Sequence, residues 1–136
     1  MQYLVVVGRI LFSLIFLLAG MGHFSSSTVA YAQAKGVPLA SVLVPLSGLL
    51  AMVGAVSIML GYKAKWGAWF IILFIIPVTI MMHDFWNVTD PMQTQVQMSM
   101  FMKNISILGA ALLINFFGSG PFSFDNRIKK LKISYP

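Results

Sequence analysis

Long apolar runs separated by short polar stretches dominate the chain. Four runs reach the roughly 20 residues that a helix needs to cross a hydrocarbon core about 30 Å thick. They cover about Tyr3 to Phe24, Leu39 to Leu60, Ala64 to Met82 and Met98 to Phe117. None has the strict alternation of a transmembrane barrel strand, and an open strand would leave backbone groups unpaired in lipid. The pattern therefore predicts an all-α membrane protein with four transmembrane helices.

The connections between the runs predict their arrangement. Gly61 closes the second run and gives a tight turn, and short connections make sequential helices antiparallel neighbours. In the first loop, the possible N-cap residues Ser25 to Thr28 precede helix formers up to Lys35, so a short interfacial helix is expected there. We therefore expect a single membrane domain over residues 1–136, an antiparallel four-helix bundle with a basic tail at 118–136.

The basic residues predict how the bundle is oriented. Lys63 and Lys65 lie between the second and third runs, the tail contains RIKKLK, and the first loop has only Lys35. Because Lys and Arg are enriched in cytoplasmic segments, we expect a multi-pass protein of the bacterial inner (cytoplasmic) membrane with both termini in the cytoplasm. The chain is 59% hydrophobic and 9% charged, which favours the lipid bilayer as its surroundings. Its bases lie at the ends of apolar runs and form no single patch, so nucleic acid is not an expected partner.

Polar residues near the ends of the apolar runs are candidates for function, since ionisable groups are costly inside a membrane. Antiparallel helices bring a set of these residues to one predicted outer level. The set is His23, His83, Asp84, Trp86, Lys103 and Asn104. It predicts a polar cluster in which Asp84 pairs with Lys103. A structural interpretation stays open beside this one, in which the pair only neutralises both charges and Trp86 belongs to an aromatic belt.

Two further polar residues have mainly structural interpretations. Arg9 lies about two turns into the first run, where it reaches the inner interface, a lipid phosphate or a polar group on the fourth helix. Asn115 shares a helix face with Asn104, a pattern typical of interhelical hydrogen bonds. No metal site is expected, because the chain has no cysteine and only two histidines. Those histidines lie on different helices near the interface, which disfavours haem.

Six segments in order resemble the DoxX family of small bacterial membrane proteins. They are GRILFSLIFLLAGMGHF, AKGVPLASVLVPL, LGYKAKWGA, MMHDFW, FMKNISILGAALL and GSGPFSFDNR. The resemblance implies a four-helix membrane bundle and an association with membrane redox systems. It identifies the residues from His83 to Trp86, the Lys103–Asn104 pair and an exit motif as family positions. The exit motif comprises Gly118, Gly120, Ser123 and Asp125. The chain departs from the family at Ala51 and His23, where many relatives have glutamate and lysine.

Two hypotheses for function follow. In the first, the protein is a non-catalytic or accessory subunit of a membrane redox system that binds a quinone or a similar lipophilic molecule near its outer face. His83, Asp84 and Lys103 would hold that ligand, and a redox protein partner would supply the electrons. In the second, the chain is an assembly or interaction module that docks on another membrane protein and has no small-molecule ligand. A homo-oligomer is open in both, and neither hypothesis identifies a catalytic residue.

Overall fold

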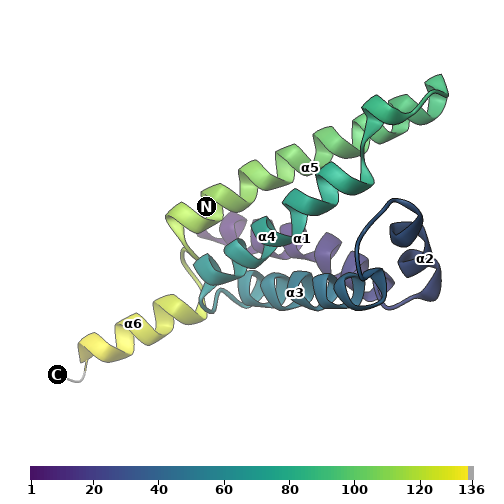
Figure 1. Cartoon of the computed structure of the whole chain (residues 1–136). Helices are drawn as coiled ribbons and strands as arrows, with labels where there is room; N and C mark the ends of the chain where they lie inside the picture. Colours follow the sequence, from purple (N-terminus) through teal and green to yellow (C-terminus); the bar gives the residue numbers. More distant parts are fainter. Residues whose placement is uncertain (135–136) are drawn as a thin grey trace.

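The computed structural model describes the backbone of residues 1–134 and the side chains of residues 1–131. Its elements are α1 (Gln2–Gly22), α2 (Ser26–Ala34), α3 (Ala40–Leu60), α4 (Ala64–Met82), η1 (Phe85–Asn87), α5 (Pro91–Phe117) and α6 (Phe124–Ser134) (Figure 1). The described residues contain no strand, and α1, α3, α4 and α5 are long and apolar enough to cross a membrane. The predicted all-α membrane bundle is confirmed. Residues 135 and 136 of the expected tail lie outside the described part.

Glycines set the closest helix contacts in the bundle. α3 packs against both α1 and α4, and α4 also packs against α5. A Cβ atom on Gly20 of α1 would lie 2.9 Å from the carbonyl oxygen of Gly48 on α3. A Cβ atom on Gly54 of α3 would lie 2.8 Å from the carbonyl oxygen of Gly67 on α4. Because lipid provides no hydrophobic drive between helices, such close backbone approach stabilises the bundle through van der Waals contact.

α5 differs most from the expected boundaries, since it begins at Pro91 and not near Met98. The Asp90 carboxylate caps the helix by accepting a hydrogen bond from the backbone N–H of Gln93 at 2.8 Å, and Pro91 follows at the first helical position. The first turns of α5 are polar, so a search for apolar runs omits them. In the first loop, Ser25 caps α2 in the same way, accepting from the N–H of Thr28 at 3.3 Å.

The two ends of the bundle differ, and we call them the tail end and the loop end. The tail end carries the turn at Gly61, the start of α1 and the root of α6, while the loop end carries α2 and η1 (Figure 1). The contact between Gly54 and Gly67 lies toward the tail end of α3 and α4. From there α4 and α5 diverge from α3 toward the loop end (Figure 1).

Candidate functional site

Asp84 forms an ion pair, but with a different lysine from the expected one. Its Oδ1 lies 2.6 Å from Nζ of Lys35, and its Oδ2 accepts a hydrogen bond from the Asn87 amide at 3.1 Å. Asp84 lies beyond the end of α4, where the chain turns through η1, and its carboxylate reaches the end of α2 instead of α5. The hydrogen bond to this carboxylate raises the pKa of the Lys35 ammonium. The expected pairing of Asp84 with Lys103 is therefore corrected.

His83 and Trp86 contact α5 in separate ways. Nδ1 of His83 lies 2.9 Å from Oε1 of Gln97, a residue that the sequence analysis did not single out. Trp86 packs edge-on against Phe85 and Phe101, with ring centroids 5.2 and 5.9 Å away. The structure thus divides the expected cluster into a Lys35–Asp84 pair, a His83–Gln97 pair and an aromatic group.

Lys103 stands apart from both pairs. Its Nζ lies 3.5 Å from Sδ of Met100, and its side chain is exposed on the surface of α5. The neighbouring Asn104 is buried at 6% exposure. The three carboxylates of the chain have other contacts, and they belong to Asp84, Asp90 and Asp125. Within the described side chains, Lys103 therefore has no acidic partner.

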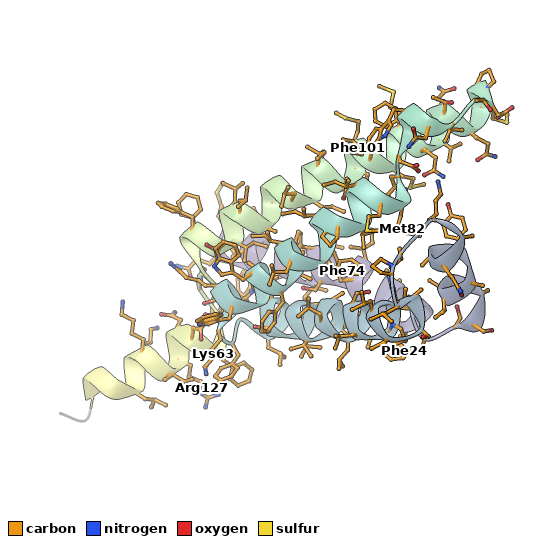
Figure 2. All side chains as sticks on the ribbon, in the orientation of Figure 1. Phe24, Lys63, Phe74, Met82, Phe101 and Arg127 are labelled. Atoms are coloured by element: carbon orange, nitrogen blue, oxygen red, sulfur yellow. The ribbon has the colours of Figure 1, made fainter. Side chains whose placement is uncertain are left out.

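A groove lies between α3 and α4 toward the loop end. Its volume is about 720 Å³, and α2 with the following loop closes it beside His23. Residues of α3 from Leu43 to Val53 and of α4 from Phe70 to Met82 form its two walls. Figure 2 shows Phe74 and Met82 at successive levels of α4. Nearly all lining side chains are aliphatic, aromatic or methionine, so the groove suits a lipophilic molecule.

Few polar groups interrupt this apolar lining, namely the side chains of His23, Thr28 and Ser47 and the backbone beside Pro77. Nδ1 of His23 lies 2.8 Å from the carbonyl oxygen of Ala19 and donates to it, and in the tautomer with its proton on Nδ1 the other ring nitrogen, Nε2, is an acceptor. No hydrogen bond to Nε2 forms within the described residues. Pro77 has no N–H to donate to the carbonyl of Leu73, and both residues line the groove. The carbonyl of Leu73 therefore lacks its usual helical donor.

At the tail end, Arg9 is buried and bound by backbone. It is 5% exposed, and its guanidinium donates to the carbonyl oxygens of Ser119 at 2.6 Å and Phe122 at 2.9 Å. Its Nε and the buried hydroxyl of Ser13 have no hydrogen-bond partner within the described residues. Arg9 was expected to reach the inner interface, a lipid phosphate or a polar group on the fourth helix, and it instead binds backbone carbonyls of the segment that follows α5.

The exit motif holds that segment against the rest of the tail end. Gly118 and Gly120 adopt φ values of 80° and 67°, which favour glycine. The Ser123 hydroxyl donates to the carbonyl of Gly120 at 2.7 Å and accepts from the N–H of Asn126 at 3.2 Å. The motif therefore turns the chain sharply and starts α6.

Asp125 and Asn115 connect this segment to the start of α4. The Asp125 carboxylate accepts hydrogen bonds from the backbone N–H groups of Lys63 at 2.8 Å and Ala64 at 3.4 Å. The Asn115 amide donates to the carbonyl of Lys65 at 3.0 Å. Both side chains thus satisfy backbone groups at a helix end, which is a structural role.

The comparisons with known proteins agree on a family. The model of the SURF4 family matches residues 1–131. Inner membrane protein YqjF of Escherichia coli (strain K12) is 33% identical over 128 residues, covering 93% of this chain and 92% of that protein. Inner membrane protein YphA of the same strain is 29% identical over 126 residues, covering 91% of this chain and 89% of that protein. No solved structure matches the chain.

These matches overturn the assignment to DoxX. The six resembling segments are mostly apolar helix with glycine turns, which unrelated membrane bundles share, whereas the SURF4 model matches almost the whole chain. The association with redox systems came only from the DoxX resemblance, and nothing else in the chain supports it. The four transmembrane helices and the inner-membrane relatives both stand without that resemblance. The chain is an integral inner membrane protein and belongs to the SURF4 family.

Proposed function

We propose that the protein binds a lipophilic molecule with a hydroxyl or N–H group in the groove between α3 and α4. The observation that carries this proposal is the volume of about 720 Å³ with an almost wholly apolar lining. That volume is within the range of about 300–1,000 Å³ typical of small-molecule sites. The positive-inside rule predicts that the groove lies in the outer half of the membrane.

The acceptors in the groove determine which ligand is favoured. Nε2 of His23 accepts in the tautomer described above, and the carbonyl of Leu73 lacks the N–H that a residue other than proline would donate from position 77. An oxidised quinone offers only carbonyl oxygens, whereas an alcohol, a quinol or an amide offers a hydrogen. Because lipid tails and the groove are equally apolar, burial discriminates little, and the hydrogen bond must provide the selectivity. One such bond contributes about 1 kcal/mol, which corresponds to about a fivefold preference.

Photoaffinity labelling of the purified protein tests the proposal with two matched probes. One is a long-chain alcohol carrying a diazirine, and the other is its methyl ether. We expect both to label the segments 43–53 and 70–82, which line the groove, and the alcohol to label them about fivefold more. His23→Phe should remove most of the preference for the alcohol while the ether still labels.

A pair of tryptophan variants separates the groove from the lipid-facing surface in general. Leu73 lines the groove and is 58% exposed, and Leu112 on α5 is 51% exposed outside it. Leu73→Trp should fill the groove and reduce labelling by both probes, while Leu112→Trp should leave it unchanged. Labelling spread evenly over all four transmembrane helices would refute a groove site.

The unpaired Lys103 favours a second function, docking on another membrane protein. Its ammonium lies on an apolar helix surface without a carboxylate, which is costly in lipid. A carboxylate from a second chain would neutralise it. In a gentle detergent, such a complex should dissociate in Lys103→Met and persist in Lys103→Arg. Complexes of identical size in the two variants would exclude this lysine from the contact.

A further inference from the structure

The tail end contains a second hollow with a chemistry opposite to that of the groove. Its volume is about 660 Å³, and it lies between the start of α4, the segment after α5 and the root of α6. Lys63, Lys65 and Lys129 line it together with the aromatic side chains of Trp66 and Phe117. Figure 2 shows Lys63 where the bundle meets α6. Three positive charges thus adjoin two rings at the end of the bundle.

The three ammonium groups lack acidic partners. Asp125 also lines the hollow, but its carboxylate accepts from the backbone N–H groups of Lys63 and Ala64. The described side chains contain one ion pair, which joins Lys35 and Asp84 at the loop end. Three lysines against one aspartate therefore leave the hollow with a net positive charge.

The aromatic residues indicate the depth of the hollow. Trp66 is 65% exposed in the first turn of α4, and Phe117 is 75% exposed at the last residue of α5. Both lie at the ends of transmembrane helices, where aromatic side chains occupy the level of the lipid headgroups. Apolar surface on the membrane side and lysines on the other side match a phospholipid, whose acyl chains and phosphate are arranged in the same order.

We propose that this hollow binds the phosphate headgroup of an anionic phospholipid. Lys65 and Lys129 contact the phosphate, and the acyl chains lie against Trp66 and Phe117. Basic pockets beside transmembrane helices are typical binding sites for such headgroups. The positive-inside rule places this end at the cytoplasmic surface, where anionic lipids attract bases. The hollow is distinct from the groove, so this proposal is independent of the function proposed above.

The test measures binding of one lipid molecule in a neutral detergent, where no charged membrane surface contributes. The probes are phosphatidylglycerol and phosphatidylcholine, each with a fluorophore on an acyl chain, and the measurement is fluorescence anisotropy. We expect the protein to bind phosphatidylglycerol more tightly. Each lysine near a lipid phosphate contributes about fivefold in affinity, so Lys65→Gln with Lys129→Gln should weaken it about 25-fold.

Two controls make the result specific. Arg127 and Lys130 lie on α6 but line a different hollow, so Arg127→Gln with Lys130→Gln removes the same charge and should change affinity less than about threefold. Lys65→Arg with Lys129→Arg keeps the charge and should retain preferential binding, which also shows that substitution at these positions permits folding.

Three outcomes would overturn the proposal. Equal weakening in the two glutamine variants would mean that binding depends on total charge and not on this hollow. Equal binding of phosphatidylglycerol and phosphatidylcholine would mean that the hollow does not select an anionic headgroup. Displacement of phosphatidylglycerol by inorganic phosphate would mean that the hollow takes a free anion instead of a lipid.

Discussion

Removing the Asp125 carboxylate tests whether the tail end is held together by the cap that α6 provides to α4. In Asp125→Ala, the backbone N–H groups of Lys63 and Ala64 lose their acceptor. Loss of an N-cap costs about 1 kcal/mol, and loss of a negative charge at a helix N-terminus costs up to about 1 kcal/mol more. We therefore expect the free energy of unfolding to fall by about 2 kcal/mol.

Two further variants separate the components of that loss. Asp125→Asn keeps an acceptor oxygen and removes only the charge, so it should cost about 0.5–1 kcal/mol. Asp90→Ala removes the cap of α5, whose Oδ1 accepts from Gln93 at 2.8 Å within the same segment, and should cost about 1 kcal/mol. The Asp125 cap should matter more, because it joins residues 62 positions apart.

The assay is equilibrium unfolding in mixed micelles of a mild detergent and dodecyl sulfate, followed by circular dichroism. Unfolding energies should decrease in the order wild type, Asp125→Asn, Asp125→Ala. A change below about 0.3 kcal/mol in Asp125→Ala would refute the reasoning, because a cap of ordinary strength costs more. Equal losses in the two Asp125 variants would mean that the charge acts and the hydrogen bonds do not.

Two other predictions follow from packing and from pH. Gly54→Leu should destabilise the protein by several kcal/mol in the same unfolding assay, because a Cβ atom there would lie 2.8 Å from the carbonyl oxygen of Gly67. Gly109→Ala is the control and should be neutral, because a Cβ atom at Gly109 would have no neighbouring atom within 4 Å. The Lys35–Asp84 pair is partly exposed and should contribute at most about 1 kcal/mol, as a comparison with Lys35→Gln would measure. The contact raises the pKa of Lys35 above 10.5 and lowers the pKa of Asp84 below 3.8, so this contribution should be present between those values. It should be lost as the pH rises through the folded-state pKa of Lys35 and as the pH falls through the folded-state pKa of Asp84. A pH dependence unchanged in Lys35→Gln would contradict this assignment.

The sequence predicted the fold well because one physical variable, the length of each apolar run, determines whether a helix can span a membrane. The length of the apolar run did not predict the start of α5, because Asp90 and Pro91 begin a helix whose first turns are polar. Antiparallel order also predicted that His23, His83 and Asp84 lie at one end of the bundle. It did not predict that the chain turns at Asp84 through η1, which brings the carboxylate to Lys35 at the end of α2 and not to Lys103.

The hydrogen-bond partners of Asp125 and Arg9 at the tail end could not be predicted from the sequence for a different reason. Asp125 caps a helix that begins 61 positions earlier, and Arg9 binds the carbonyl of Ser119, 110 positions later. Such partners share no local pattern, because only the folded chain brings them together. The Leu73 carbonyl did have a signal in the sequence, since a proline inside a helix always leaves one carbonyl without its usual donor.

The two ends of the bundle differ in a way that explains why the groove is open where it is. At the tail end, Arg9, Asn115 and Asp125 bind backbone groups of neighbouring segments and fix α1, α4 and α5 there. The contact of Gly54 with Gly67 then holds the backbones of α3 and α4 close together beside the groove residues Val53 and Phe70. Beyond that contact the helices diverge, and side chains such as Leu73 point into space that no described helix fills. Because these contacts fix one end of the bundle, we expect any displacement of α3 and α4 by the proposed ligand to be confined to their far ends, where α2 and the Lys35–Asp84 pair close the bundle.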